Sequence, residues 1–202
     1  MKGIPYLVAA ALCLLLTAEG AAAAQRKSLQ VEIEVAYVQF PLAAIAPLSA
    51  RGTVTLEALR ELRKRGKGVL LCAPCVRGPS GQNASVRSSR LYEEPIADGD
   101  AAPAKRYRSD VALNETPTVG PDGVTIDVVV QPELSIREIP NENADATAPE
   151  REVFKYSTAT TLKAQDGVPM LLGGGVKSPD GTGLVYVIVT ARLVHADGSA
   201  AR

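Results

Sequence analysis

The sequence predicts a mainly β, antiparallel domain with one short α-helix, following an N-terminal signal peptide. Three observations support this class. Polarity alternates from Ser28 to Phe40, Asp-Gly turn signals separate β-favouring runs between Arg151 and Val194, and a helical stripe occurs at Leu56–Arg65. Alternation with a period of two is typical of half-buried strands. Asp-Gly between apolar runs favours a hairpin, because glycine accepts the positive φ of a tight turn.

The first 24 residues have the pattern of an export signal. Lys2 is followed by an apolar run, Ile4–Leu16, and then by alanines at positions 21–24. These are the cationic, apolar and small-residue regions of a secretory signal peptide, and the run is shorter than the roughly 20 residues that a transmembrane helix needs. We expect cleavage after Ala23 or Ala24, which leaves residues 25–202 as one exported domain.

The first strand and the residues after it are strongly apolar. Val31, Ile33 and Val35 share one face of the strand, which we expect to end at Pro41 because proline cannot donate to a ladder. Residues 42–50 are apolar and bounded by proline, and we expect them to form a packed loop.

The predicted helix, Leu56–Arg65, has signals at both ends. Thr55 is an N-cap residue, Gly66 a C-terminal stop, and leucines at positions 56, 59 and 62 form its apolar stripe. Cations in its later turns suit the negative end of the helix dipole. An anionic partner or a lipid headgroup is the alternative interpretation of these cations.

The middle of the chain is expected to be strands and loops. Val69–Val76 is a candidate buried strand interrupted by Pro74, and a turn at residues 78–82 leads into a strand at Ala84–Tyr92. Val124–Val130 is rich in β-branched residues and is expected to continue, extended, to Ile139. Polar segments with proline, near 97–112 and 140–150, are expected to be exposed loops.

The last quarter of the chain, Arg151–Val194, predicts a three-strand antiparallel meander. Its turns are expected at Gln165–Gly167 and at Ser178–Gly183. The final run places Val185, Val187 and Val189 on one face.

Cys72-Ala73-Pro74-Cys75 is the most conspicuous chemical motif. In an exported chain the two thiols can form a local disulfide or a redox pair. A thioredoxin-like site needs a helix after the cysteines, whereas here the predicted helix precedes them. A single Cys-x-x-Cys pair supplies only two of the four ligands of structural zinc. Two small packed residues, or a local disulfide between Cys72 and Cys75, are the interpretations we favour.

Other features give no catalytic set. Gly173-Gly174-Gly175 is followed by a further strand, so it lacks the helix N-terminus that holds a phosphate, and close packing or a bulge is expected. His195 is the only histidine, which leaves no recognisable Ser/His/Asp set. The 22 basic and 22 acidic residues balance, which does not favour nucleic acid. We expect a protein that is not an enzyme and has no metal or cofactor.

Five segments, in order, resemble the C-terminal β-domain of bacterial secretins. They are VEIEVAYVQF, LLCAPCVRGPSGQNASVRSSRLY, VGPDGVTIDVVVQPELS, FKYSTATTLKAQDGVPMLLGGGV and GLVYVIVTARLV. The positions that match the family's motifs are Pro74, Gly81, Gln82, Ala84, Gly167, Gly173 and Gly174. The usual arginine after the proline is replaced by Cys75, and only about 30 residues separate the first strand from Pro74, where secretins carry longer hairpins.

The resemblance implies a cell-envelope function. Secretins form homo-oligomeric rings in the outer membrane for type II and type III secretion and for type IV pili. By this resemblance the chain is a minimal secretin core that pairs with copies of itself through β-edges, with other secretion-system proteins as further partners. The alternatives are a periplasmic binding or scaffold module that forms no pore and a thiol–disulfide protein that uses Cys72 and Cys75.

Overall fold

The computed structural model describes residues 29–50, 52–93, 105–140 and 149–201. The predicted signal peptide, residues 97–104 and 141–148 of the two predicted loops, and the last residue lie outside these ranges. The elements in chain order are β1 (Leu29–Pro41), α2 (Leu42–Ser49), α3 (Leu56–Lys64), β2 (Val69–Cys72), β3 (Cys75–Pro79), β4 (Ala84–Glu93), β5 (Arg106–Val119), β6 (Thr125–Ile139), β7 (Arg151–Ser157), β8 (Thr160–Gln165), β9 (Met170–Lys177) and β10 (Gly183–His195).

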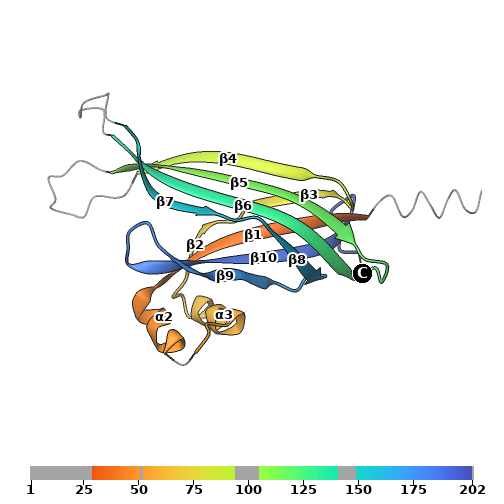
Figure 1. Ribbon diagram of the computed structural model, residues 1–202, viewed down its shortest axis with the longest axis horizontal. Coiled ribbons are helices and arrows are strands. Elements are labelled where there is room, and N and C mark those ends of the chain that lie inside the picture. Colours follow the sequence, from red (N-terminus) through yellow and green to blue (C-terminus); the bar gives the residue numbers. More distant parts are fainter. Residues whose placement is uncertain (1–28, 51, 94–104, 141–148, 202) are drawn as a thin grey trace, which may run out of the picture.

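Two antiparallel sheets pack face to face, and the helices lie on the outer side of one of them (Figure 1). Sheet A has the order β2-β1-β10-β9, with β3 continuing the β2 edge along β1. Sheet B has the order β4-β5-β6-β7, with β8 continuing the β7 edge along β6. The mainly β, antiparallel class predicted from the sequence is therefore confirmed.

The main core fills the space between the sheets. Val31, Ile33 and Val35 of β1 are fully buried there, opposite β6 side chains such as Val128 and Val130. The alternation predicted for β1 is confirmed, and it is matched by the inward face of β10, which pairs with β1 along its whole length. A domain of this size is stabilised mainly by such apolar burial.

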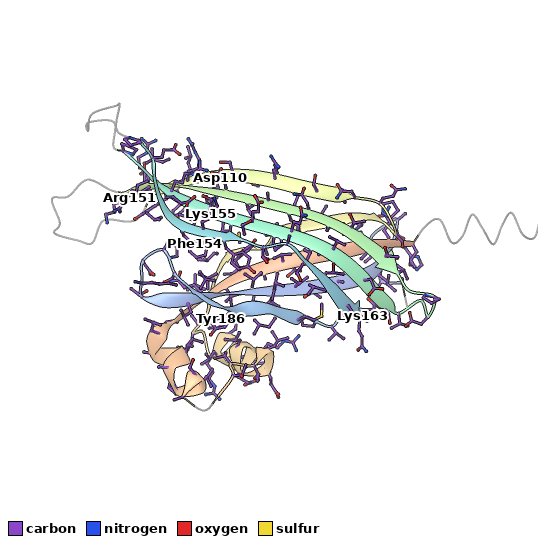
Figure 2. The ribbon with its side chains drawn as sticks, in the orientation of Figure 1. Asp110, Arg151, Phe154, Lys155, Lys163 and Tyr186 are labelled. Carbon is purple, nitrogen blue, oxygen red and sulfur yellow. The ribbon has the colours of Figure 1, made fainter. Side chains whose placement is uncertain are left out.

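A second, smaller core lies between sheet A and the helices. Phe40 and Tyr186 meet edge to face there, with ring centroids 6.0 Å apart, and Ile45 and Leu59 cover them from α2 and α3. Figure 2 shows Tyr186 on the side of sheet A that faces the helices. This half of sheet A is buried on both faces.

The prediction of a packed loop at residues 42–50 is wrong, because Leu42–Ser49 forms α2. This second helix persists although it contains Pro47, which removes one intrahelical hydrogen bond. Burial of Ile45 against the second core compensates for that loss. The predicted helix, by contrast, is confirmed as α3: the Thr55 hydroxyl accepts from the Ala58 N–H at 3.3 Å, and Gly66 follows with φ +70°.

The predicted three-strand meander is also wrong. Its first run is divided into β7 and β8, and both pair with β6 in sheet B. Only β9 and β10 form a hairpin, in sheet A. Turn signals locate the chain reversals but cannot specify whether the next strand stays in the same sheet. The turn at Gly167 instead carries the chain from sheet B to sheet A.

Two further expectations need correction. Val69–Val76 is not one buried strand but two short edge strands, and Val69 is 62% exposed. The loop predicted near 97–112 is shorter than expected, because β5 begins at Arg106. In both cases the structure depends on a strand that is distant in the sequence, because β2 pairs with β1 on one side and β5 pairs with β6 along its whole length.

Candidate interaction surface

The four sheet edges differ in how continuous they are. In sheet A one edge is divided at Ala73-Pro74 between β2 and β3, and the other, β9, is bulged at its glycines. In sheet B the β7–β8 edge is divided at residues 158–159. Interruptions of this kind shorten the regular stretch that an edge offers to a further strand.

The fourth edge, β4, has no interruption. All ten of its residues, Ala84–Glu93, pair with β5 without a register shift. Within the described ranges no strand pairs with its other side. Most of its side chains are exposed, and it contains neither proline nor glycine. β4 therefore presents the longest regular row of backbone groups among the edges of the described structure.

The side chains of β4 are polar near its middle and apolar near its end. Arg87 and Arg90 alternate with serines, while Leu91 is 57% exposed. The Tyr92 ring stacks on Tyr107 of β5, with centroids 5.4 Å apart. The edge thus combines charges, which keep it soluble, with an apolar end that a partner strand could cover.

The outer face of sheet B is strongly polar beside this edge. A hollow of about 700 Å³ is lined by Arg87, Asp110, Glu133, Arg137 and Lys155, among others. Arg137 lies 3.6 Å from Asp110, and both signs of charge are interspersed. Asp110 and Lys155 are both labelled on sheet B in Figure 2. The mixture of charges indicates a hydrated face rather than a site selective for one ion.

The two cysteines of the CAPC motif lie on opposite faces of sheet A. Cys72 pairs with Tyr37 and packs against the main core, whereas Cys75 pairs with Glu34, whose side chain points away from that core. Both thiols are free in the structure. Pro74 separates them, and its carbonyl accepts from the Val35 N–H at 3.0 Å.

The electrostatics of both thiols disfavour the reactive thiolate. Burial raises the pKa of Cys72 to about 12. Burial, followed by the carboxylates of Glu32 and Glu34, also raises the pKa of Cys75. A nucleophilic cysteine needs the opposite shift. In the ranges that the structure describes, no group of three or more His, Cys, Asp or Glu side chains could hold a metal ion.

The residues that match secretin motifs lie at chain reversals and bulges, not together in one site. Gly81 (φ +78°), Gly167 (φ +70°) and Gly173 (φ +74°) adopt backbone conformations that favour glycine. Gln82 lies beside Gly81 in the turn before Ala84, the first residue of β4, and Gly174 continues the bulge of β9. Their common property is backbone geometry, and Gly81, Gln82 and Ala84 together define where β4 begins.

Sequence analysis missed one unusual residue, Glu115 of β5. Its side chain is 1% exposed, and neither carboxylate oxygen has a hydrogen-bond partner. Burial raises its pKa to about 7. The alternation of residues 113–119 indicates an inward-facing carboxyl group at position 115 once this segment is part of a strand that begins at Arg106.

The fold is similar to that of several solved secretin structures. The chain is similar to GspD in the ETEC pilotin–secretin AspS–GspD complex, with 14% identity and a TM-score of 0.47, over 90% of this chain and 53% of that one. GspD of the E. coli K12 type II secretion system is 13% identical, with a TM-score of 0.47, and the match covers 90% of this chain and 54% of that one. The InvG secretin domain of the Salmonella SPI-1 injectisome is 7% identical, with a TM-score of 0.45, and the match covers 82% of this chain and 62% of that one.

The chain spans between about half and three fifths of the length of these structures. They belong to the family that the sequence motifs resemble. No protein-family model and no curated protein matches the sequence. Among the described helices, none has both the length and the apolar character needed to cross a membrane.

Proposed function

We propose that this protein is a non-enzymatic, exported component of a bacterial cell envelope that assembles with copies of itself by strand-edge pairing. Its role is that of a subunit of an outer-membrane secretion pore. The β4 edge carries this proposal, because ten residues of regular strand have no partner on one side in the described structure. An unpaired edge offers backbone donors and acceptors to another strand. The secretin-like segments of the sequence support the same kind of assembly.

The two edges of sheet B suggest how copies meet. β4 forms one edge, and β7 with β8 forms the other. Pairing β4 of one copy with the β7–β8 edge of the next is a head-to-tail contact, and a repeated head-to-tail contact closes into a ring when its rotation allows. The sheets of successive copies would then be continuous. The exposed Leu91 would be covered in this contact.

The test uses proline substitutions at neighbouring positions of β4 in the mature chain, Ser88→Pro and Ser89→Pro. Backbone groups of adjacent strand residues point to opposite edges. One substitution therefore removes a hydrogen bond to β5, and the other removes a donor only from the free edge. We expect the variant that keeps the thermal stability of the parent to lose association by about tenfold or more.

Native mass measurement and electron microscopy of detergent-extracted material report the assembly. The matched control is Val69→Pro, at the exposed first residue of β2, which should assemble normally because proline is tolerated at the start of an edge strand. A strictly monomeric parent chain, in detergent and in membranes, would overturn the proposal. Normal assembly of the β4 variant that keeps the thermal stability of the parent would overturn the assignment of the edge.

Ion conductance of the assembled protein in planar bilayers separates the pore from the alternative. Assembly with conductance supports the pore subunit. Assembly without conductance, together with fractionation into the soluble periplasmic fraction, supports a binding or scaffold module. The raised pKa values of Cys72 and Cys75 do not favour the thiol–disulfide alternative.

A further inference from the structure

The connection from β3 to β4 carries the chain from sheet A to sheet B, and β5 holds it in place. The Asn83 side chain donates to the carbonyl of Glu115 at 3.1 Å. The Gly81 N–H donates to the carbonyl of Pro117 at 2.6 Å, and the Ser80 hydroxyl accepts from the Val119 N–H at 3.0 Å. This segment, residues 76–84, is called the crossover below.

The Glu115 side chain lies beneath this crossover. Its strand partners are Ala84 of β4 and Val130 of β6. On β3, a Cβ added at Gly78 would lie 3.9 Å from a Glu115 carboxylate oxygen and 3.1 Å from the Ala84 Cβ. The carboxyl group is thus enclosed where both sheets meet, and a side chain at Gly78 would require Ala84 to shift.

No charge on the packed strands compensates this carboxyl group. Arg77 of β3 and Glu32 of β1 pair at 2.6 Å on the opposite face of sheet A. Arg87 of β4 and Glu133 of β6 both line the hollow on the outer face of sheet B. The residues that β1, β3, β4 and β6 direct inward beside Glu115 are apolar: Val31, Val76, Ala84, Val86, Val128 and Val130. Burial alone accounts for the raised pKa of Glu115, about 7.

We propose that Glu115 is a pH-sensitive latch that holds the crossover closed when its carboxyl group is protonated and loosens it when the group ionises. A buried carboxylate without a partner is costly, and displacing the crossover or the start of β4, which enclose it, would expose it to water. Opening lets the carboxyl group return to its ordinary pKa. The closed state therefore loses favour as the pH rises through the acidic range towards 7 and changes little above that.

The latch has a consequence for assembly, which rests on the proposed function. Ala84 is both the strand partner of Glu115 and the first residue of the β4 edge. Loosening the crossover disorders the start of that edge. Assembly through β4 is therefore expected to be stronger in acid than at neutral pH.

The test compares amide hydrogen exchange of the mature parent chain with Glu115→Gln at the same pH, so that intrinsic exchange rates cancel. At a pH of about 5 the two should exchange similarly over residues 76–84, and at about 8 the parent should exchange about tenfold or more faster. In the Glu115→Leu variant the crossover should also remain closed at both pH values. Glu133→Gln, on the outer face of the neighbouring strand, should behave like the parent.

A pH-independent ratio between the parent and Glu115→Gln overturns the latch, as does an equal effect of Glu133→Gln. The exchange ratio does not require assembly. A pH-dependent ratio in a chain that never assembles would therefore support the latch and overturn the proposed function. A pH-independent ratio in a chain that assembles would overturn the latch and support the proposed function.

Discussion

The strand pair β1–β10 and the edge strand β4 differ in how many of their sides are covered. β1 pairs with β10 over all thirteen residues, has β2 and β3 on its other edge, and is covered by sheet B on one face and by helices over part of the other. Among the described strands β4 pairs with β5 alone, and most of its side chains are exposed. The comparison teaches that the burial that stabilises the fold is concentrated in β1 and β10, whereas the backbone groups left open to a further strand lie on β4.

The largest expected difference comes from removing one side chain in each region. Phe40→Ala deletes a fully buried ring that contacts Tyr186, and we expect a loss of about 3–5 kcal/mol in the free energy of unfolding. Leu91→Ala on β4 should cost about 0.5 kcal/mol or less, because that side chain is 57% exposed. Urea unfolding at concentrations where the protein is monomeric measures both. Equal losses would contradict the comparison.

Glu115 makes the stability of sheet B depend on pH. Its pKa in the folded protein is about 7, above the ordinary value of 4.5, so the folded state binds the proton more tightly. The contribution of Glu115 to the free energy of unfolding is therefore complete below a pH of about 4.5. It is lost as the pH rises to about 7, by up to about 3 kcal/mol. Glu115→Gln should remove this dependence in unfolding curves measured across the range. A parent curve that is flat between these values would contradict the assignment.

Two glycines allow a central strand and an edge strand of sheet A to be compared by the same substitution. A Cβ at Gly183, the start of β10, would lie 2.5 Å from the Phe40 carbonyl oxygen, whereas one at Gly174 on the β9 edge would meet nothing within 4 Å. We expect Gly183→Ala to lower the free energy of unfolding by about 1–3 kcal/mol and Gly174→Ala to change it by less than about 1 kcal/mol. Thermal unfolding of the two variants, side by side, tests the prediction. Similar melting temperatures would show that β10 can shift away from Phe40.

The smallest effect concerns the helices that cover β1. Thr55→Ala removes the side-chain cap of α3, which accepts from Ala58, and should cost about 1 kcal/mol. Thr55→Ser keeps the hydroxyl and should cost less. Circular dichroism during urea unfolding reports both. If the two variants are equally destabilised, the hydroxyl cap does not contribute and α3 is held by its packing against the second core.

The sequence was sufficient for features that depend on neighbours within a few residues. The alternation of β1, the caps of α3 and the positive φ of Gly81 and Gly167 follow from local sterics and hydrogen bonding. The start of β4 at Ala84 was likewise predicted from the turn signals at residues 78–82, whereas the status of Ala84 as a motif position came from the resemblance to secretins. Sequence patterns did not distinguish the β4 edge from the other edges, because continuity is a property of the paired strand.

The tertiary structure decided which segments meet. β7 and β8 pair with β6 rather than forming a meander with β9, α2 forms because Ile45 can be buried on sheet A, and Glu115 becomes enclosed because β3 passes over it. These outcomes depend on residues far apart in the sequence, whose contacts repay the entropy of ordering only when the sheets are assembled. What the sequence by itself determined is the local set of strands, turns and the helix α3. Their partners and their burial were set by packing between the sheets.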